Sequence, residues 1–304
     1  MIFSADIHAR YLRPKARKDN YLETQDKKLR FLCQLAQKSP PWLISGDLFN
    51  NAHPGDWILG YIISLFKEYN VCPAVIPGQH DMPDHSLEIM KKDSGLNVLK
   101  AAGVISLLPT EEKDGGFLWD DDLIYGCPYG QQPPTIEEEG WNKILLWHNM
   151  VIKDDPLWNK QIASTGERIL RKYPMFDIIC TGDNHNTFVC ENKGRFLVNP
   201  GSMMRMKTNQ KDHKPCVFRW DKGNLEQIFL PIEEDVFDDS HITEKEEKEN
   251  RLDGFITKLN EIRPELNENS SVSFKGNLKN FFQVNPETRG VEEITWRCVP
   301  KDRK

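Results

Sequence analysis

The sequence predicts an α/β protein with two β-sheets in its core and helices on the outside. Short apolar runs of strand length alternate with longer segments whose apolar residues recur at helical spacing. Later in the chain, turn residues at 192–194 and 221–224 separate pairs of strand-like segments, which is typical of β-hairpins. This order of elements fits a layered sandwich.

The first third of the chain alternates strands with amphipathic helices. One helix shows the pattern clearly, because Leu29, Leu32, Cys33 and Ala36 share one helical face. The predicted strands are 2–5, 42–45 and 74–76, and the predicted helices are 24–37, 57–69 and 96–102.

Strand-like segments dominate the middle of the chain, at 105–108, 123–125, 144–147 and 177–180. After Pro231 the composition changes. Residues 244–263 are highly charged but keep apolar residues at helical spacing, as in a surface helix that packs one face. We therefore predict a main domain at 1–232 and a small helical C-terminal segment at 233–304, which caps that domain or binds a partner.

Composition restricts the function classes. Of the 304 residues, 38% are hydrophobic and 28% charged, which favours a packed core. No apolar run approaches the ~20 residues that span a bilayer, and the N-terminus does not resemble a signal peptide. Seven cysteines without a C-x-x-C pair indicate free thiols in a reducing compartment, so we expect a cytoplasmic protein without membrane contact. The net charge of −6 excludes a globally basic nucleic-acid binder, so any DNA contact would be local and cation-assisted.

Five short motifs place metal-binding side chains directly after predicted strands. Strand C-termini of α/β proteins open onto the crevice where ligands bind, so loops held there can converge on one point. Each motif alone is weak, but their joint occurrence in this order predicts one metal centre. They are Asp6-Ile7-His8, Gly46-Asp47-Leu48-Phe49-Asn50, Gly78-Gln79-His80-Asp81, Trp147-His148-Asn149 and Gly182-Asp183-Asn184-His185.

The ligand types indicate which ions this centre would bind. Mixed Asp and His ligands suit Mn²⁺, Fe²⁺, Zn²⁺ or Ni²⁺, and suit Mg²⁺ less well. The motifs supply too many ligands for one ion. Two ions ~3.5–4 Å apart would use them, with one carboxylate shared.

Together the five motifs resemble the signature of the calcineurin-like metallophosphoesterases, over about the first 230 residues. The resemblance implies a four-layer α-β-β-α sandwich and a metal-dependent hydrolase in which metal-activated water attacks phosphorus. The run 46–49, followed by 77–81, is most similar to the DNA-repair nuclease branch, which includes the nuclease subunit of the bacterial SbcCD complex and its phage relatives. The stretch 197–202 resembles the closing strand and turn of the family.

The resemblance also implies a role for each matching residue. His80 would stand beside the scissile phosphate and stabilise the transition state or protonate the leaving oxygen, while Asp81 could orient its ring. Asp47 would bridge both ions. The other ligands would be Asp6, His8 and His185 for one ion, and Gln79, His148 and Asp183 for the other.

Three positions depart from the family pattern. The family usually has Asn where Gln79 stands and His where Asp183 stands, and the nuclease branch usually has Asp or His where Asn50 stands. Gln79 keeps the amide oxygen on a longer arm. Asp183 replaces a nitrogen ligand by an anionic oxygen, which favours harder ions such as Mn²⁺ or Mg²⁺.

From these features we expect two bound divalent ions, with Mn²⁺ favoured, and hydrolysis of DNA phosphodiesters as an exonuclease or structure-selective endonuclease. Arg10, Asn50 and Arg205 are candidate substrate-binding residues. Arg10 begins a basic loop with Tyr11 and Tyr21 nearby, which could grip a nucleic-acid backbone and stack bases or could be a solvated loop.

Partners and alternatives remain open at this point. The resemblance implies a coiled-coil ATPase subunit as a partner, and a homodimer is a further expectation. A phosphomonoesterase or cyclic-nucleotide phosphodiesterase for small molecules is the second hypothesis, which the acidic charge and short C-terminal region favour. The third hypothesis is a metal-binding scaffold with little turnover, for which Gln79 and Asp183 are the support.

Overall fold

The computed structural model describes residues 1–108, 116–136, 140–154, 163–221, 223–234 and 236–238, together with Phe282. The chain divides into two compact units, Met1–Asp238 and Asp239–Lys304. The helix predicted at 244–263 and most of the segment 233–304 lie outside the described residues. Within the described part, no helix is both long and apolar enough to cross a membrane.

The first six-stranded sheet has the order β14-β13-β1-β2-β3-β4. Strands β1 to β4 pair in parallel, whereas β13 pairs antiparallel with both β1 and β14. The motifs that follow β1, β2 and β3 therefore leave the sheet at the same edge. The strands are β1 (Ile2–Ser4), β2 (Trp42–Ile44), β3 (Ala74–Val75), β4 (Ser106–Leu107), β13 (Cys216–Asp221) and β14 (Asn224–Phe229).

The second six-stranded sheet has the order β11-β12-β10-β7-β6-β5. Its central strands are parallel, and the remaining two motifs follow its neighbours β7 and β10, with Gly182 opposite His148 in the register. The strands are β5 (Gly116–Trp119), β6 (Asp122–Cys127), β7 (Asn142–His148), β10 (Ile178–Gly182), β11 (Phe188–Asn192) and β12 (Arg195–Asn199). A separate pair is formed by β8 (Val151–Ile152) and β9 (Ser164–Thr165).

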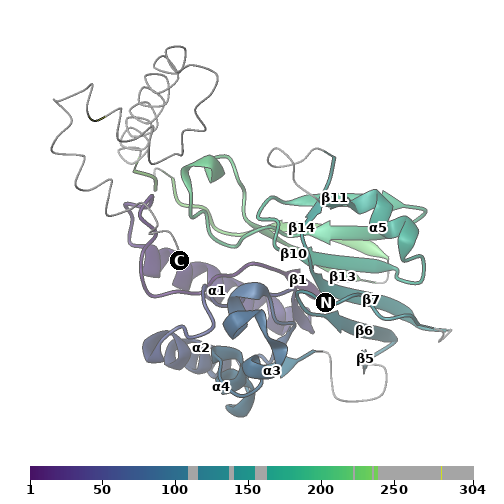
Figure 1. Cartoon of the computed structure of the whole chain (residues 1–304), viewed down its shortest axis with the longest axis horizontal. Helices are drawn as coiled ribbons and strands as arrows, with labels where there is room; N and C mark the ends of the chain where they lie inside the picture. Colours follow the sequence, from purple (N-terminus) through teal and green to yellow (C-terminus); the bar gives the residue numbers. More distant parts are fainter. Residues whose placement is uncertain are drawn as a thin grey trace, which may run out of the picture. The chain divides into compact units, whose positions relative to one another are not determined.

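Helices cover the outer faces of the two sheets, and this gives four layers (Figure 1). Side chains from α1, α2 and α4 pack on the first sheet, and α5 packs on the second. This arrangement confirms the predicted fold class. The helices are α1 (Tyr21–Lys38), α2 (Asp56–Glu68), α3 (Leu87–Met90), α4 (Gly95–Ala101) and α5 (Gly166–Lys172), with 3₁₀ turns η1 (Gln79–Asp81), η2 (Pro83–His85) and η3 (Thr208–Gln210).

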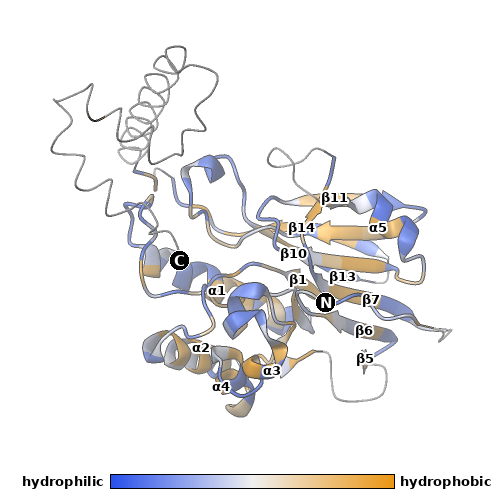
Figure 2. Cartoon of the chain, viewed as in Figure 1, coloured by the Kyte–Doolittle hydropathy of each residue, from blue (hydrophilic) through white to orange (hydrophobic). Residues whose placement is uncertain are grey.

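The inner strands β1, β2 and β3 of the first sheet are buried on both faces, which explains their largely apolar sequences. Phe3 and Leu43 face the core between the two sheets, where they join Ile144. Their neighbours Ile2 and Ile44 face the helices instead. Successive side chains of a strand point to opposite faces, so a strand in the middle of four layers needs apolar residues at every position. Figure 2 shows this concentration of hydrophobic residues along the strands.

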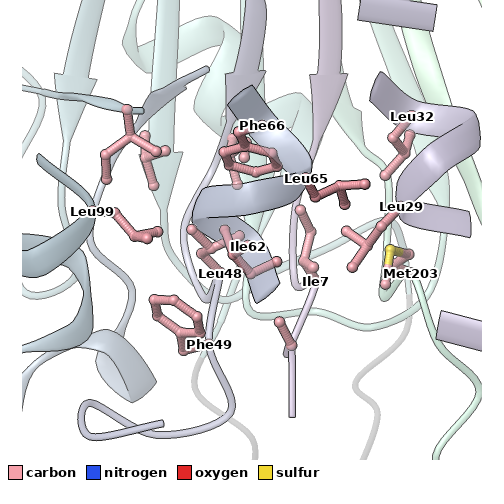
Figure 3. Packing of buried hydrophobic residues seen from close by; sticks show 14 of the residues in the cluster. Ile7, Leu29, Leu32, Leu48, Phe49, Ile62, Leu65, Phe66, Leu99 and Met203 are labelled. Atoms are coloured by element: carbon pink, nitrogen blue, oxygen red, sulfur yellow. The ribbon is translucent and has the colours of Figure 1, made fainter. Parts of the chain in front are cut away.

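The helical side of the first sheet forms a cluster of its own, shown in Figure 3. Leu29 of α1 and Phe66 of α2 are fully buried there, beside Ile7 from the loop after β1. Full burial of each such side chain stabilises the fold by about 1.5–3 kcal/mol. This packing therefore anchors the loop that carries Asp6 and His8 against two helices.

Several elements were not predicted from the sequence. Helix α5 contains only Ile169 and Leu170 as large apolar residues, too few for a periodic signal, and it begins at Thr165, whose hydroxyl accepts from Arg168 N. Strand β5 is an edge strand with Leu118 53% exposed, so it lacks the apolar run of the inner strands. Strands β8 and β9 have two residues each.

Candidate metal centre

The five motifs converge at the edge of the sandwich where the parallel strands end. Backbone hydrogen bonds hold neighbouring loops together, from Asp6 N to Gly46 O at 3.1 Å and from His8 N to Asp47 O at 3.0 Å. The second sheet joins through Asp183 N, which donates to the carboxylate of Asp6 at 3.1 Å. Loops that are far apart in sequence are thus fixed relative to one another before any ligand is considered.

Four of the predicted ligands have left-handed backbone conformations. The φ angles are 48° at Asp6, 48° at His8, 52° at Asp47 and 79° at Asp183. Such conformations cost roughly 1–3 kcal/mol each in residues other than glycine and persist where the surroundings enforce them. Here they turn several polar side chains inward at one place, which is typical of a functional site.

Two glycines permit the close packing around these side chains. A Cβ at Gly46 would lie 2.1 Å from Nδ1 of His148, and one at Gly78 would lie 2.1 Å from Oδ1 of Asp47. Both positions therefore require glycine, one beside a histidine from the other sheet and one beside the central carboxylate.

Asp6, His8 and His185 form one group whose ligand atoms all lie within 4.8 Å of one another. Nε2 of His8 is 3.1 Å from Nε2 of His185 and 4.0 Å from Oδ1 of Asp6. Burial lowers the pKa of His8 to about 3 and that of His185 to about 4, so both rings are neutral at neutral pH. Neutral imidazoles facing each other offer lone pairs to a cation.

Asp47 lies between this group and His148. Its Oδ2 is 3.8 Å from Nε2 of His8 and 3.6 Å from Nε2 of His148. Oδ1 accepts a hydrogen bond from His80 N, but Oδ2 is buried and has no hydrogen-bond partner in the described part of the chain. A buried carboxylate oxygen without a donor, facing histidines on two sides, fits a bridging metal ligand.

The predicted second group is joined by side-chain contacts. Nε2 of His148 lies 2.6 Å from Oε1 of Gln79, and Nε2 of Gln79 donates to Oδ1 of Asp183 at 2.6 Å. Nδ1 of His148 faces the Ser45 carbonyl at 2.6 Å. Burial opposes a charge on His148, but the Asp47 carboxylate outweighs it and raises the pKa to about 10. With acceptors at both nitrogens, this ring marks a position that attracts a cation.

The charge balance of the centre also favours cations. Asp6, Asp47 and Asp183 bring three carboxylates together, and the first two are fully buried. Burial raises the pKa of Asp6 to about 8 and raises that of Asp183. Like charges in a buried cluster need compensation, and divalent ions bound by these oxygens and imidazoles would provide it. The residues therefore fit a dinuclear metal site.

His80 differs from the other histidines of the centre because it is exposed. Its ring centroid lies 5.0 Å from that of His8, and one of its nitrogens is within 4.8 Å of ligand atoms of His8 and Asp47. This position lets the ring reach a substrate that approaches from solvent. His8, Asp47 and His80 thus form a further group whose atoms lie close enough together to hold an ion.

Asp81 does not have the predicted contact with the His80 ring. Its Oδ2 accepts from Leu48 N at 3.2 Å and from Gly78 N at 3.0 Å, and its Oδ1 accepts from Phe49 N at 2.9 Å. Both oxygens are thus occupied by backbone amides, and the side chain is 1% exposed. Asp81 ties the loop after β3 to the loop after β2, so its role is to position Asp47 rather than to orient His80.

The three predicted substrate-binding residues separate into two cases. Arg10 and Asn50 are brought together, with Nη1 of Arg10 donating to Oδ1 of Asn50 at 3.0 Å. Arg205 is directed into the protein instead, where Nη1 donates to the Lys211 carbonyl at 3.0 Å and Nη2 donates to the Glu233 carbonyl. It is 9% exposed, so its guanidinium supports the loops and does not face a substrate. The sequence gives no sign of this, because a buried arginine is unusual.

Supporting residues of the centre were missed by the sequence analysis. The Ser45 carbonyl fixes the orientation of His148. Asn199 Nδ2 donates to the carbonyls of Asn184 and Asn186 at 2.6 and 2.7 Å, which holds the loop around His185. The ring of Tyr129 packs 6.3 Å from that of His148. Only Asn199 had a signal, as part of the run that resembles the closing strand of the family.

Comparisons with known proteins identify a family that agrees with the geometry of the centre. The model of the family described as calcineurin-like phosphoesterase matches residues 2–187. A comparison with curated proteins gave no match. A solved structure of a putative 5'-nucleotidase from Staphylococcus aureus is 16% identical, with 81% of this chain and 57% of that chain covered and a TM-score of 0.42.

In two other solved structures the match with this chain covers almost the whole of the other protein. An archaeal phosphodiesterase is 12% identical, with 75% of this chain and 98% of that chain covered and a TM-score of 0.39. The protein TT1561 of Thermus thermophilus is 13% identical, with 74% and 96% covered and a TM-score of 0.41. The family match spans more than half of the chain and all five motifs. The chain therefore belongs to the calcineurin-like phosphoesterases, a family of metal-dependent hydrolases.

Proposed function

We propose that this phosphoesterase hydrolyses phosphodiester bonds of DNA, as a relative of the SbcCD-type nuclease branch. The observation that carries the proposal is the exposed His80 beside seven predicted ligands that are buried or half-buried. A substrate phosphate that approaches the ligands from solvent would meet His80 first. His80 therefore differs in exposure from the side chains that would hold the ions, although it lies next to His8 and Asp47.

The residues of this chain would divide the reaction between them. Asp6, His8 and His185 would hold one ion, and Gln79, His148 and Asp183 the other, with Asp47 shared. When bound, such ions supply Lewis-acid polarisation of the phosphate and a nucleophile from water. Nε2 or Nδ1 of His80 would donate a proton to the leaving oxygen, or a hydrogen bond to the charge that develops there. Among the candidate ions we favour Mn²⁺, because Asp183 adds an anionic oxygen.

Two features support DNA over a small phosphoester. The runs 46–49 and 77–81 resemble the nuclease branch. Arg13 and Lys15, five and seven residues after His8, are exposed, and we expect them to contact phosphates next to the scissile bond. These are local positive charges on a protein whose net charge is −6, as a cation-assisted DNA contact would require.

Purified protein with Mn²⁺, assayed on labelled DNA and on a chromogenic phosphodiester, tests the proposal. We expect wild-type protein to cut both. Turnover of the chromogenic diester without DNA cleavage would favour a small-molecule phosphoesterase, and turnover of neither would favour the scaffold hypothesis.

His80→Asn tests the role of the exposed histidine. We expect kcat to fall by ~10²–10⁴-fold, because asparagine cannot supply a proton, while metal analysis still finds both ions. His8→Asn is the matched variant and should lose metal content first. If His80→Asn loses metal as His8→Asn does, then His80 is a ligand and the assigned role is wrong.

A further inference from the structure

Two exposed aromatic rings, Tyr11 and Trp57, form a row with the partly buried ring of Tyr61, and Tyr11 stands three residues after His8. Tyr11 is 52% exposed and Trp57 is 51% exposed. The ring centroids of Tyr11 and Trp57 lie 5.1 Å apart at an interplanar angle of 61°, and Trp57 stacks on Tyr61 at 5.4 Å and 4°. What distinguishes Tyr11 and Trp57 is that they are exposed side by side, because contiguous exposed apolar surface is typical of interaction sites.

The row is held rigidly from beneath. The Tyr61 hydroxyl donates to Oδ1 of Asp26 at 2.7 Å, and Nε of Arg30 donates to the same carboxylate at 3.0 Å. Trp57 lies one helical turn before Tyr61 on α2, so the two rings lie over one another. Tyr11 then meets Trp57 at its edge, and binding a ligand on Tyr11 would require little ordering of side chains.

Tyr11 lies close in the chain to the residues that would hold the ions and the scissile phosphate. Tyr11 follows His8 by three residues, so their Cα atoms are at most ~11 Å apart even in a fully extended chain. Arg10 precedes Tyr11 in the chain and donates a hydrogen bond to Asn50, and Arg13 is exposed in the same loop. A polynucleotide with its scissile phosphate at the centre would bring an adjacent nucleotide to this place.

We infer that Tyr11, buttressed by Trp57, is a stacking platform for an unpaired base of the DNA substrate next to the scissile phosphate. The inference rests on the proposed function and narrows the substrate class to single strands or duplex ends with unpaired bases. A base inside a duplex has both faces covered, whereas an unpaired base can lie on an aromatic ring. Tyr21, which the sequence places in the same region, is 2% exposed and takes no part.

Binding of a fluorescein-labelled oligothymidylate to the full chain tests the inference. Phosphorothioate linkages slow cleavage while Mn²⁺ stays bound during the fluorescence anisotropy measurement, and an abasic strand of the same length and linkage has the same backbone without bases. Tyr11→Ala should weaken binding of oligothymidylate by roughly 5- to 100-fold and leave binding of the abasic strand unchanged. Tyr11→Phe keeps the ring and should bind oligothymidylate as wild type does.

Trp141→Ala is the matched control. Trp141 is 41% exposed and precedes β7 at the end opposite to His148, about 23 Å away at ~3.3 Å per residue. Its removal should leave both affinities unchanged. Turnover of the chromogenic diester should be the same in wild type and in Tyr11→Ala, since that substrate has no base to stack.

Two results would overturn the inference alone. One is unchanged oligothymidylate affinity in Tyr11→Ala while wild type binds and cuts DNA. The other is an effect of Tyr11→Ala that extends beyond the bases, either as an equal loss of affinity for the abasic strand or as a loss of chromogenic turnover. The ring of Tyr11 would then support the loop of His8. Wild-type protein that hydrolyses the chromogenic diester but neither binds nor cuts DNA would overturn the proposed function as well.

Discussion

The contact between Gly46 and His148 predicts a large effect from a single methyl group. Gly46→Ala would place a Cβ 2.1 Å from Nδ1, 2.6 Å from Cγ and 2.9 Å from Cε1 of the fully buried His148 ring. The ring cannot retreat without losing its contact with the Ser45 carbonyl, which is 2.6 Å from Nδ1. The same movement would shift Nε2 away from Asp47 and Gln79.

The expected destabilisation has two parts. A left-handed backbone, with φ at 88°, costs an alanine roughly 1–2 kcal/mol. Overpacking against a buried ring typically adds about 1–3 kcal/mol, and the weakened hydrogen bond adds about 1 kcal/mol. The total is about 3–6 kcal/mol.

Gly130→Ala separates the two parts. Gly130 has a similar φ of 78°, but a Cβ there would meet nothing within 4 Å. Gly130→Ala should be destabilised only by the strain of the left-handed backbone. The free energies of unfolding of the two variants should therefore differ by about 2–4 kcal/mol. For a domain of this size that difference corresponds to roughly 4–16 °C in Tm.

Thermal unfolding, metal analysis and turnover of the chromogenic diester measure the consequences. Gly46→Ala should melt well below Gly130→Ala, and its kcat should fall by ~10²-fold or more because displacement of a positioning group by about 1 Å has that effect. Equal melting temperatures for the two alanine variants, with full activity in Gly46→Ala, would refute the assigned packing of His148.

Two further predictions concern groups away from the reacting atoms. Asp81→Asn should raise the Mn²⁺ concentration for half-maximal activity by ~10–100-fold with little change in kcat at saturating metal, because Asp81 positions the loop that carries the ligand Asp47. The control is Asp84→Asn, at an exposed position. A loss of kcat in Asp81→Asn equal to that in His80→Asn would contradict this role. Burial lowers the pKa of Lys28 from its usual value near 10.5 to about 8, although Nζ donates to the Met203 carbonyl. Since unfolded Lys28 binds its proton more tightly, the free energy of unfolding should rise between pH 8 and 10.5, by up to ~1.4 kcal/mol per pH unit, and urea unfolding of Lys28→Met should lack that rise. Identical pH profiles for wild type and Lys28→Met would contradict the assignment.

The sequence was sufficient to predict that the five motifs meet. Each motif follows an apolar run, and the carboxyl ends of parallel strands share an edge, so Asp6 and Asp47 had to lie on neighbouring loops. The motifs of the second sheet meet those of the first only because the two sheets pack face to face. The order of predicted elements favoured a two-sheet sandwich, and the family resemblance implied its four layers.

The errors have a common physical origin. Asp81 was predicted to orient the ring of His80, and Arg205 was predicted to bind substrate. In the structure, Asp81 accepts from backbone amides and Arg205 donates to backbone carbonyls. Backbone groups of irregular loops leave no trace in the sequence, and so the side chains that satisfy them cannot be distinguished there from functional ones.

The predicted ligands come from both sheets, so bound ions would link the two halves of the sandwich. Asp6, His8, Asp47 and Gln79 come from loops of the first sheet, and His148, Asp183 and His185 come from the second. Ions bound by both sets would add a direct link between halves of the domain that meet mainly through apolar side chains. Ligand binding stabilises the state that presents the intact site, by about 2.7 kcal/mol at a free concentration 100 times Kd. Metal supply to the cell would thus govern the lifetime of the folded protein as well as its catalytic rate.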